Sequence, residues 1–167
     1  MNPVQLHMLF NHLPVVGGWI GLAILIVGIL RKNDIVRTTG LTVLAIAGLT
    51  GIPASKSGEA SEEVMEEWPG VSHALIHEHE EAAEWATPLM VVSGLLAVVA
   101  LFWKSRSKVF SWAAVAVGLF GGVAMMRTAH LGGLIRHLEL TQNAPNPDPN
   151  NPGQTELPTE GETEHDD

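Results

Sequence analysis

The 167-residue chain contains no cysteine and no tyrosine. Without cysteine it forms no disulfide, supplies no thiolate ligand to a metal and cannot attach a c-type haem covalently. Basic residues are also few, because nine Lys and Arg stand against eighteen Asp and Glu, for a formal net charge of -9. A chain this acidic lacks the basic face that nucleic-acid binding requires, so we expect no nucleic-acid partner.

Apolar residues make up 46% of the chain, although its net charge is strongly negative. The apolar residues gather in four runs, each close to the ~17–25 residues that a membrane-spanning helix needs. Helices satisfy their own backbone hydrogen bonds inside lipid. The sequence therefore predicts an all-α membrane protein, a bundle of four transmembrane helices. The predicted helices cover residues 4–30, 35–54, 73–103 and 109–137.

The basic residues predict the orientation of these helices. Six of the nine Lys and Arg lie in two short connections, "RKNDIVR" (31–37) and "KSRSK" (104–108). By the positive-inside rule both connections face the cytoplasm. Both termini and the long middle connection then face the periplasm, as in a multi-pass protein of a bacterial inner membrane. The first run has no basic start and no Ala-x-Ala site, so we expect a retained helix instead of a cleaved signal.

The middle connection and the C-terminal tail are both acidic. The segment "SGEASEEVMEEW" (57–68) predicts a short surface helix with Ser61 near its N-cap, ended by "PG" at 69–70. Ser72 is expected to cap a second helix that continues into the third span. We place the transmembrane domain at 1–140. Residues 141–167 form a Pro-rich acidic tail, either an extended arm on a partner subunit or a solvated segment.

Histidine is the clearest chemical signal. The predicted topology places seven of the eight histidines at the periplasmic end of the bundle. Helical phase puts His79 on the apolar face of its helix, toward the bundle, and places His73 and His77 on the charged face. Histidines from several helices at one depth favour a bound group. The seven residues are His7, His12, His73, His77, His79, His130 and His137.

Two kinds of bound group fit these residues. A b-type haem takes two imidazoles from facing helices, and an arginine pairs with its propionates. Alternatively, imidazoles and a carboxylate hold copper, iron or zinc. A third interpretation is a structural subunit without a cofactor. The haem ligands are expected from His12, His79 and His137, with His7 next and Arg136 at a propionate; the metal ligands from His7, His12, His79, His137 and Glu80.

Two motifs resemble a known family. "HMLFNHLP" has the spacing His-x4-His-apolar-Pro, and "GGLIRH" follows the last apolar run. Over residues 3–140 the chain resembles the bacterial four-helix membrane family catalogued as domain of unknown function 2231. The residues that carry the resemblance are His7, His12, Pro14, His79, Gly132, Gly133 and His137.

Some members of that family are fused to Rieske or cytochrome c domains, which implies a redox setting. The leading expectation is therefore a membrane cytochrome-like subunit in the lipid bilayer. It would pass electrons between the quinone pool, or a larger respiratory or other membrane complex, and a periplasmic cytochrome.

Overall fold

The computed structural model describes residues 2–66 and 71–136 and, of Arg136, the backbone alone. These residues form four helices long and apolar enough to cross a membrane, as expected of a multi-pass membrane protein. The predicted all-α fold with four spans is confirmed at this level. The predictions for His137, the 69–70 break and the tail fall outside the described residues. The four spans are Pro3–Leu30, Asp34–Met65, His73–Phe102 and Lys104–Ile135.

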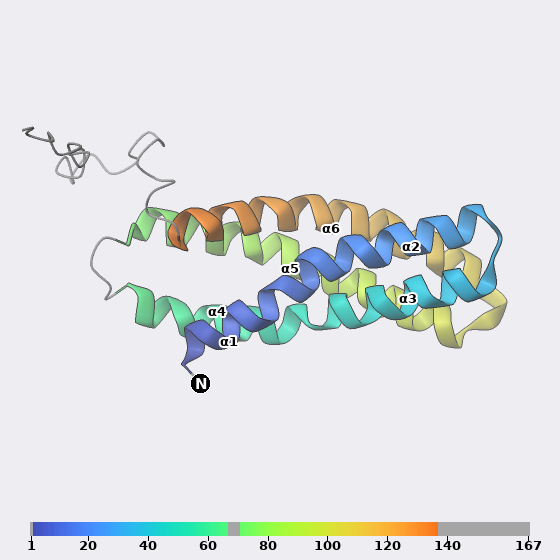
Figure 1. Cartoon of the computed structure of the whole chain (residues 1–167), viewed down its shortest axis with the longest axis horizontal. Coiled ribbons are helices and arrows are strands. Elements are labelled where there is room, and N and C mark those ends of the chain that lie inside the picture. The colour runs from blue at the N-terminus through green and yellow to red at the C-terminus, as the bar shows by residue number, and fades with distance from the viewer. Residues whose placement is uncertain (1, 67–70, 137–167) are drawn as a thin grey trace, which may run out of the picture.

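Successive spans run antiparallel to each other along the long axis of the molecule (Figure 1). The first span consists of α1 (Pro3–His12), the π-helical turn η1 (Leu13–Gly17) and α2 (Gly18–Leu30). The second consists of α3 (Asp34–Leu49) and α4 (Gly51–Met65). The third is α5 (His73–Phe102), and η2 (Lys104–Arg106) leads into α6 (Ser107–Arg136).

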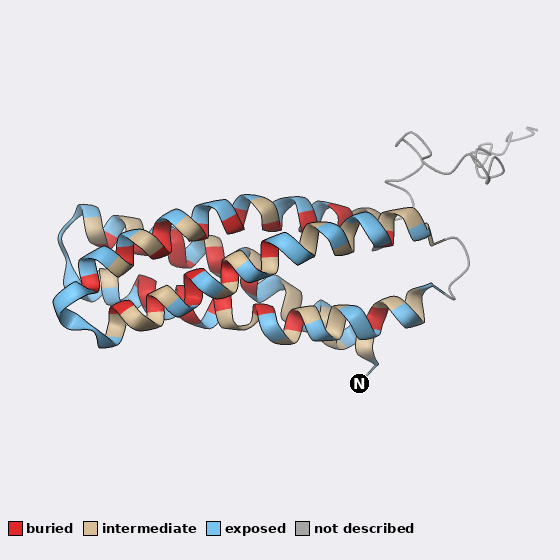
Figure 2. Ribbon diagram, turned by 180° about the vertical axis from the view of Figure 1, so that it is seen from behind, coloured by how far each residue is buried: buried red, intermediate tan, exposed pale blue. Residues whose placement is uncertain are grey.

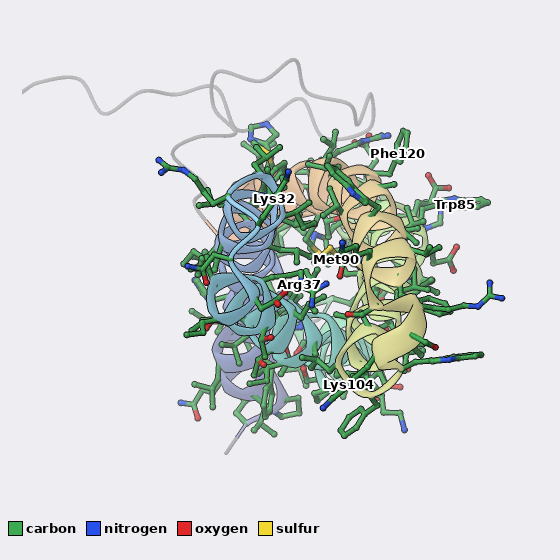
Figure 3. The ribbon with its side chains drawn as sticks, turned by 90° about the vertical axis from the view of Figure 1, so that its right-hand side faces the viewer. Lys32, Arg37, Trp85, Met90, Lys104 and Phe120 are labelled. Atoms are coloured by element: carbon green, nitrogen blue, oxygen red, sulfur yellow. The ribbon has the colours of Figure 1, made fainter. Side chains whose placement is uncertain are left out.

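Two ends of the bundle are named by their residues. The basic end holds the α2–α3 and α5–α6 connections, with Lys32 and Lys104 (Figure 3). At the histidine end α1 begins, α4 ends, α5 begins and α6 ends (Figure 1). Around the bundle each helix contacts the next in the order α2, α3, α5, α6 and back to α2. The first and third spans are therefore diagonal to each other.

The α2–α3 turn at the basic end follows from two residues. Lys32 adopts a positive φ of 51°, and the amide of Asn33 donates to the carbonyl of Gly28 over 3.0 Å. This is the hydrogen bond of a Schellman-type helix end. The Asn33 side chain then accepts from the amides of Ile35 and Val36, which caps α3. The turn explains why the first two spans are antiparallel neighbours.

Small residues let the helix backbones approach closely. Gly48 on α3 and Gly94 on α5 pack against each other, since a Cβ added at Gly94 would lie 3.1 Å from the Gly48 Cα. Without a hydrophobic drive between helices in lipid, such close packing is a main source of association. Met90 fills the centre of the bundle (Figure 3) and is fully buried.

The outer surface of the bundle is apolar. Trp85 and Phe120 point away from the helices (Figure 3) and are 77% and 74% exposed. Buried residues follow the inward sides of the helices and gather toward the middle and the basic end (Figure 2). A water-soluble protein rarely exposes apolar surface of this extent. The exposed residues therefore match helices whose outward faces contact lipid.

Two details of the predicted helices are wrong. The second helix does not end at residue 54, because α4 continues it to Met65 and absorbs the segment predicted as a separate surface helix. Ser61, the predicted cap, lies inside α4 and donates to the Ser57 carbonyl. The first span, predicted from residue 4, begins at Pro3, where Asn2 caps α1 by accepting from the Val4 amide, and the π-helical turn accommodates Pro14.

Candidate functional site: two histidines at one end of the bundle

His7 on α1 and His79 on α5 each lie against a neighbouring helix. The Nδ1 atom of His7 is 2.9 Å from the carbonyl oxygen of Ala54 on α4. The Nδ1 atom of His79 is 2.8 Å from the carbonyl oxygen of Thr128 on α6. A carbonyl oxygen only accepts, so in both rings Nδ1–H is the donor. In its neutral form, each ring then keeps the lone pair on Nε2 for another partner.

The two imidazoles come together between the diagonal spans. Their ring centres are 6.2 Å apart, and the ring planes are perpendicular. Metal–nitrogen bonds of about 2.0–2.1 Å on opposite sides of one ion would place two ring centres roughly 6 Å apart. The spacing of His7 and His79 thus matches that of two imidazoles on a single ion. A backbone carbonyl that fixes the other ring nitrogen is the usual support of a histidine ligand.

Both rings line a cavity of about 480 Å³ to which all four spans contribute at the histidine end. Its wall is largely apolar, with Val4, Val15, Ile76 and Met125 among the lining residues. The polar part of the wall is acidic, and no Lys or Arg occurs among its described residues. The acidic lining residues are Glu59, Glu62, Glu80 and Glu84.

The other predicted ligands lie in different surroundings or outside the described residues. His12 reaches the cavity wall, but its side chain is exposed and its Nδ1 donates to the Met8 carbonyl over 2.8 Å. Glu80 lines the cavity and lies 3.9 Å from His77. Arg136 is the last residue of α6, and the structure gives no position for its side chain. His137, a leading prediction, is outside the described residues.

The remaining predicted positions match the helical phase. His73 and His77 are exposed, and their ring nitrogens lie near carboxylates, such as that of Glu81 at 3.4 Å from His77. His130 on α6 is exposed as well. His79 lies toward the bundle, as its place on the apolar face predicted. Among the histidines that the structure describes, the cluster therefore reduces to a central pair, His7 and His79.

Within the described ranges, His7 and His79 are the only predicted histidine ligands whose rings lie close together. Across residues 2–66 and 71–136, no three His, Asp or Glu side chains gather where they could hold one metal ion. One further polar atom is notable, because Oδ1 of Asn11 is buried beside the cavity without a hydrogen-bond partner. A group bound here would need only two protein ligands, or would draw others from water or from itself.

One position beside the histidine pair was missed by the sequence interpretation. Gly58 on α4 lies directly under His7, since a Cβ there would be 3.2 Å from both Cε1 and Nδ1 of the ring. Gly132 on α6 has the same relation to His79, at 3.1 Å from Cε1. Gly132 was part of the "GGLIRH" motif, whereas Gly58 had been assigned to a surface helix.

Comparisons of the chain with family models, curated proteins and solved structures give no match. The resemblance to the domain of unknown function 2231 family thus stays a prediction. The fold and site define the class of protein only as a four-helix, membrane-type bundle with a histidine pair in a cavity at one end.

Proposed function

We propose that this protein is a b-type cytochrome-like electron-transfer subunit whose haem iron is held by His7 and His79. The observation that carries the proposal is the pair itself, two imidazoles 6.2 Å apart with both Nδ1–H groups already donated. A haem needs only two protein ligands because the porphyrin supplies the others. Two imidazoles, with no third close group among residues 2–66 and 71–136, fit that requirement.

The surroundings of the pair support the same proposal. The ligands stand on diagonal spans, so a flat group between them would face the apolar wall of the cavity. The haem would supply a one-electron redox centre, and the chain would orient the imidazoles and exclude water from the iron. Arg136 remains the proposed partner of a propionate, and His12 and His137 remain proposed neighbours of the site.

Orientation and partners are part of the proposal. The basic end would face the cytoplasm of the inner membrane, because it carries Arg31, Lys32, Lys104 and Arg106. The histidine end would then face the periplasm and exchange electrons with the quinone pool, a membrane complex or a periplasmic cytochrome. The acidic residues of the cavity wall would attract a basic partner at low ionic strength.

A copper, iron or zinc ion held by the same two imidazoles is the second candidate. The observation that favours it is the acidic wall, because Glu59, Glu62, Glu80 and Glu84 repel the carboxylates of a haem and attract a cation. Imidazole suits all three metals. Glu80 is the carboxylate we assign as a further ligand in this case.

An absorption spectrum of the detergent-purified protein, before and after hemin addition, tests the proposal. The expected result is a Soret band and a sharp α-band on reduction, lost in His7→Ala and in His79→Ala. His130→Ala is the matched control, since this exposed histidine on α6 is not among the residues that line the cavity. A colourless protein with stoichiometric copper, iron or zinc would support the second candidate. A protein that binds neither would overturn both.

A further inference from the structure

The first and third spans repeat one pattern of burial. His7 and His79 are 72 residues apart. At positions of the first and third spans that differ by 72, every buried residue of α1, η1 and α2 corresponds to a buried residue of α5. No buried residue of α5 is left over. The matched residues are Val4, Pro14, Gly18, Gly21, Leu22, Leu25 and Gly28 with Ile76, Ala86, Met90, Ser93, Gly94, Ala97 and Ala100.

The second and fourth spans repeat in the same way. A shift of 74 residues, the separation of Gly58 and Gly132, matches seven of the nine buried residues of α3 and α4 with buried residues of α6. The exceptions are Ala45 and Ser61, and on α6 the buried residues Ser107, Ser111 and Leu131 have no buried counterpart. The matched residues are Gly40, Leu41, Leu44, Ala47, Gly48, Gly51 and Ala54 with Ala114, Val115, Gly118, Gly121, Gly122, Met125 and Thr128.

The chain is therefore built as two tandem helical hairpins in equivalent environments. Both hairpins begin at the histidine end, so the axis that relates them runs along the bundle, as in membrane proteins with parallel repeats. Across the first and third spans the only identical residues in register are His7 with His79 and Val27 with Val99. The histidine is thus one of very few side chains that both hairpins retain.

Each hairpin also repeats the way in which its histidine is held. His7 donates to the carbonyl of Ala54 and lies over Gly58, four residues further along α4. His79 donates to the carbonyl of Thr128 and lies over Gly132, four residues further along α6. In a helix the carbonyl of one residue points toward the residue four positions later. A glycine there leaves room beside the carbonyl for an imidazole.

We infer that Gly58 and Gly132 are paired positioning residues, which seat His7 and His79 from equivalent places in the two hairpins. The shared ligand site then lies between the repeats, with one imidazole from each. The inference rests on the proposed function, because it assigns these glycines to the site that binds the haem or metal. Alanine at either glycine would bring a Cβ within 3.1–3.2 Å of the ring, and the ring must shift by a few tenths of an ångström.

The direct test is NMR of the purified full chain with ¹⁵N-labelled histidine, without any added ligand. We expect Gly58→Ala to shift the ring signals of His7 alone, and Gly132→Ala those of His79 alone. His7→Gln and His79→Gln assign the signals. Gly133→Ala is the matched control, because a Cβ at Gly133 has nothing within 4 Å. If Gly132→Ala leaves the His79 signals in place, or shifts them no more than the control does, the inference fails.

Hemin titration supplies a second, independent measurement. A ring moved from its preferred geometry by this amount should weaken hemin affinity by roughly three- to tenfold in Gly132→Ala. In a His79→Ala background the same glycine change should weaken it no further, since the glycine acts through the ring. A further loss in that background would contradict the positioning role. If the wild-type protein binds no hemin, the proposed function fails while the NMR measurement still decides the seating of the rings.

Discussion

Replacing Gly48 with alanine should force the two hairpins apart where they pack most closely. A Cβ at Gly48 would collide with the carbonyl oxygen of Met90 and lie 2.8 Å from the Cα of Gly94. Ordinary contact begins at 3.4 Å, so α3 and α5 must separate by about 0.6 Å or more. Both obstructing atoms belong to the backbone of α5, so no side-chain rotation relieves the contact.

The expected cost follows from two opposing effects. Overpacking a well-packed contact costs about 1–3 kcal/mol. Alanine favours the helix over glycine by up to about 1 kcal/mol. Gly51→Ala, three residues away, isolates the second effect because its Cβ would make ordinary contacts of 3.4 Å with Thr87 and Val91. Gly48→Ala should therefore be less stable than Gly51→Ala by about 1–3 kcal/mol.

Reversible unfolding in mixed micelles, with increasing dodecyl sulfate and circular dichroism as the signal, measures this difference. Gly51→Ala should be equal to or more stable than the wild type, and Gly48→Ala clearly less stable. Equal stability of the two variants would refute the close approach of Gly48 and Gly94 and, with it, the packing that sets the third span beside the second.

Two further predictions concern packing and orientation. Ser93→Ala removes the buried hydroxyl that donates to the Ala114 carbonyl over 2.9 Å, so the same titration should show a loss of stability of about 0.6–1.7 kcal/mol. Ser105→Ala is the control, because Ser105 is exposed and its replacement should cost no stability. A Ser93→Ala variant as stable as the wild type would contradict the hydrogen bond. The chain has no cysteine, so single cysteines introduced by Lys32→Cys and Glu66→Cys report the orientation without background labelling. In intact spheroplasts an impermeant maleimide should label the Glu66→Cys variant alone. Labelling of the Lys32→Cys variant alone would contradict the proposed topology.

The four spans could be predicted because apolar runs of this length have few alternatives. The inward position of His79 could also be predicted, since Leu75, Ile76 and Ala83 mark one apolar face of a regular helix. Both inferences used only composition and helical periodicity. They needed no knowledge of which helices are neighbours.

The partner of His79 could not be predicted in the same way. The sequence favoured His12 over His7 as a ligand, whereas the ring that lies beside His79 is that of His7, on the helix that begins at Pro3 and continues into the π-helical turn. Gly58 was missed because acidic residues nearby indicated a surface helix, although α4 continues the second span beneath His7. The places of His7 and Gly58 beside the cavity follow from the packing of helices against one another, which helical periodicity does not reveal.

The repeat was hidden for a related reason. Burial in a membrane bundle depends on the size and phase of side chains, so Leu22 and Gly94 occupy equivalent buried places without resembling each other. The histidine and the glycine beneath it are among the few residues that stay the same in both hairpins, with Val27 and Val99, Val43 and Val117, and Gly48 and Gly122. Sequence identity alone was too sparse to reveal the two hairpins.

The most direct test of the account is the spin state of hemin bound to the purified protein, measured by electron paramagnetic resonance. The account predicts a low-spin signal typical of two imidazole ligands in the wild type. His79→Gly should convert it to a high-spin signal, and free imidazole should restore the low-spin form by replacing the missing ring. A low-spin signal that His79→Gly leaves unchanged would contradict the claim that His7 and His79 together hold one iron.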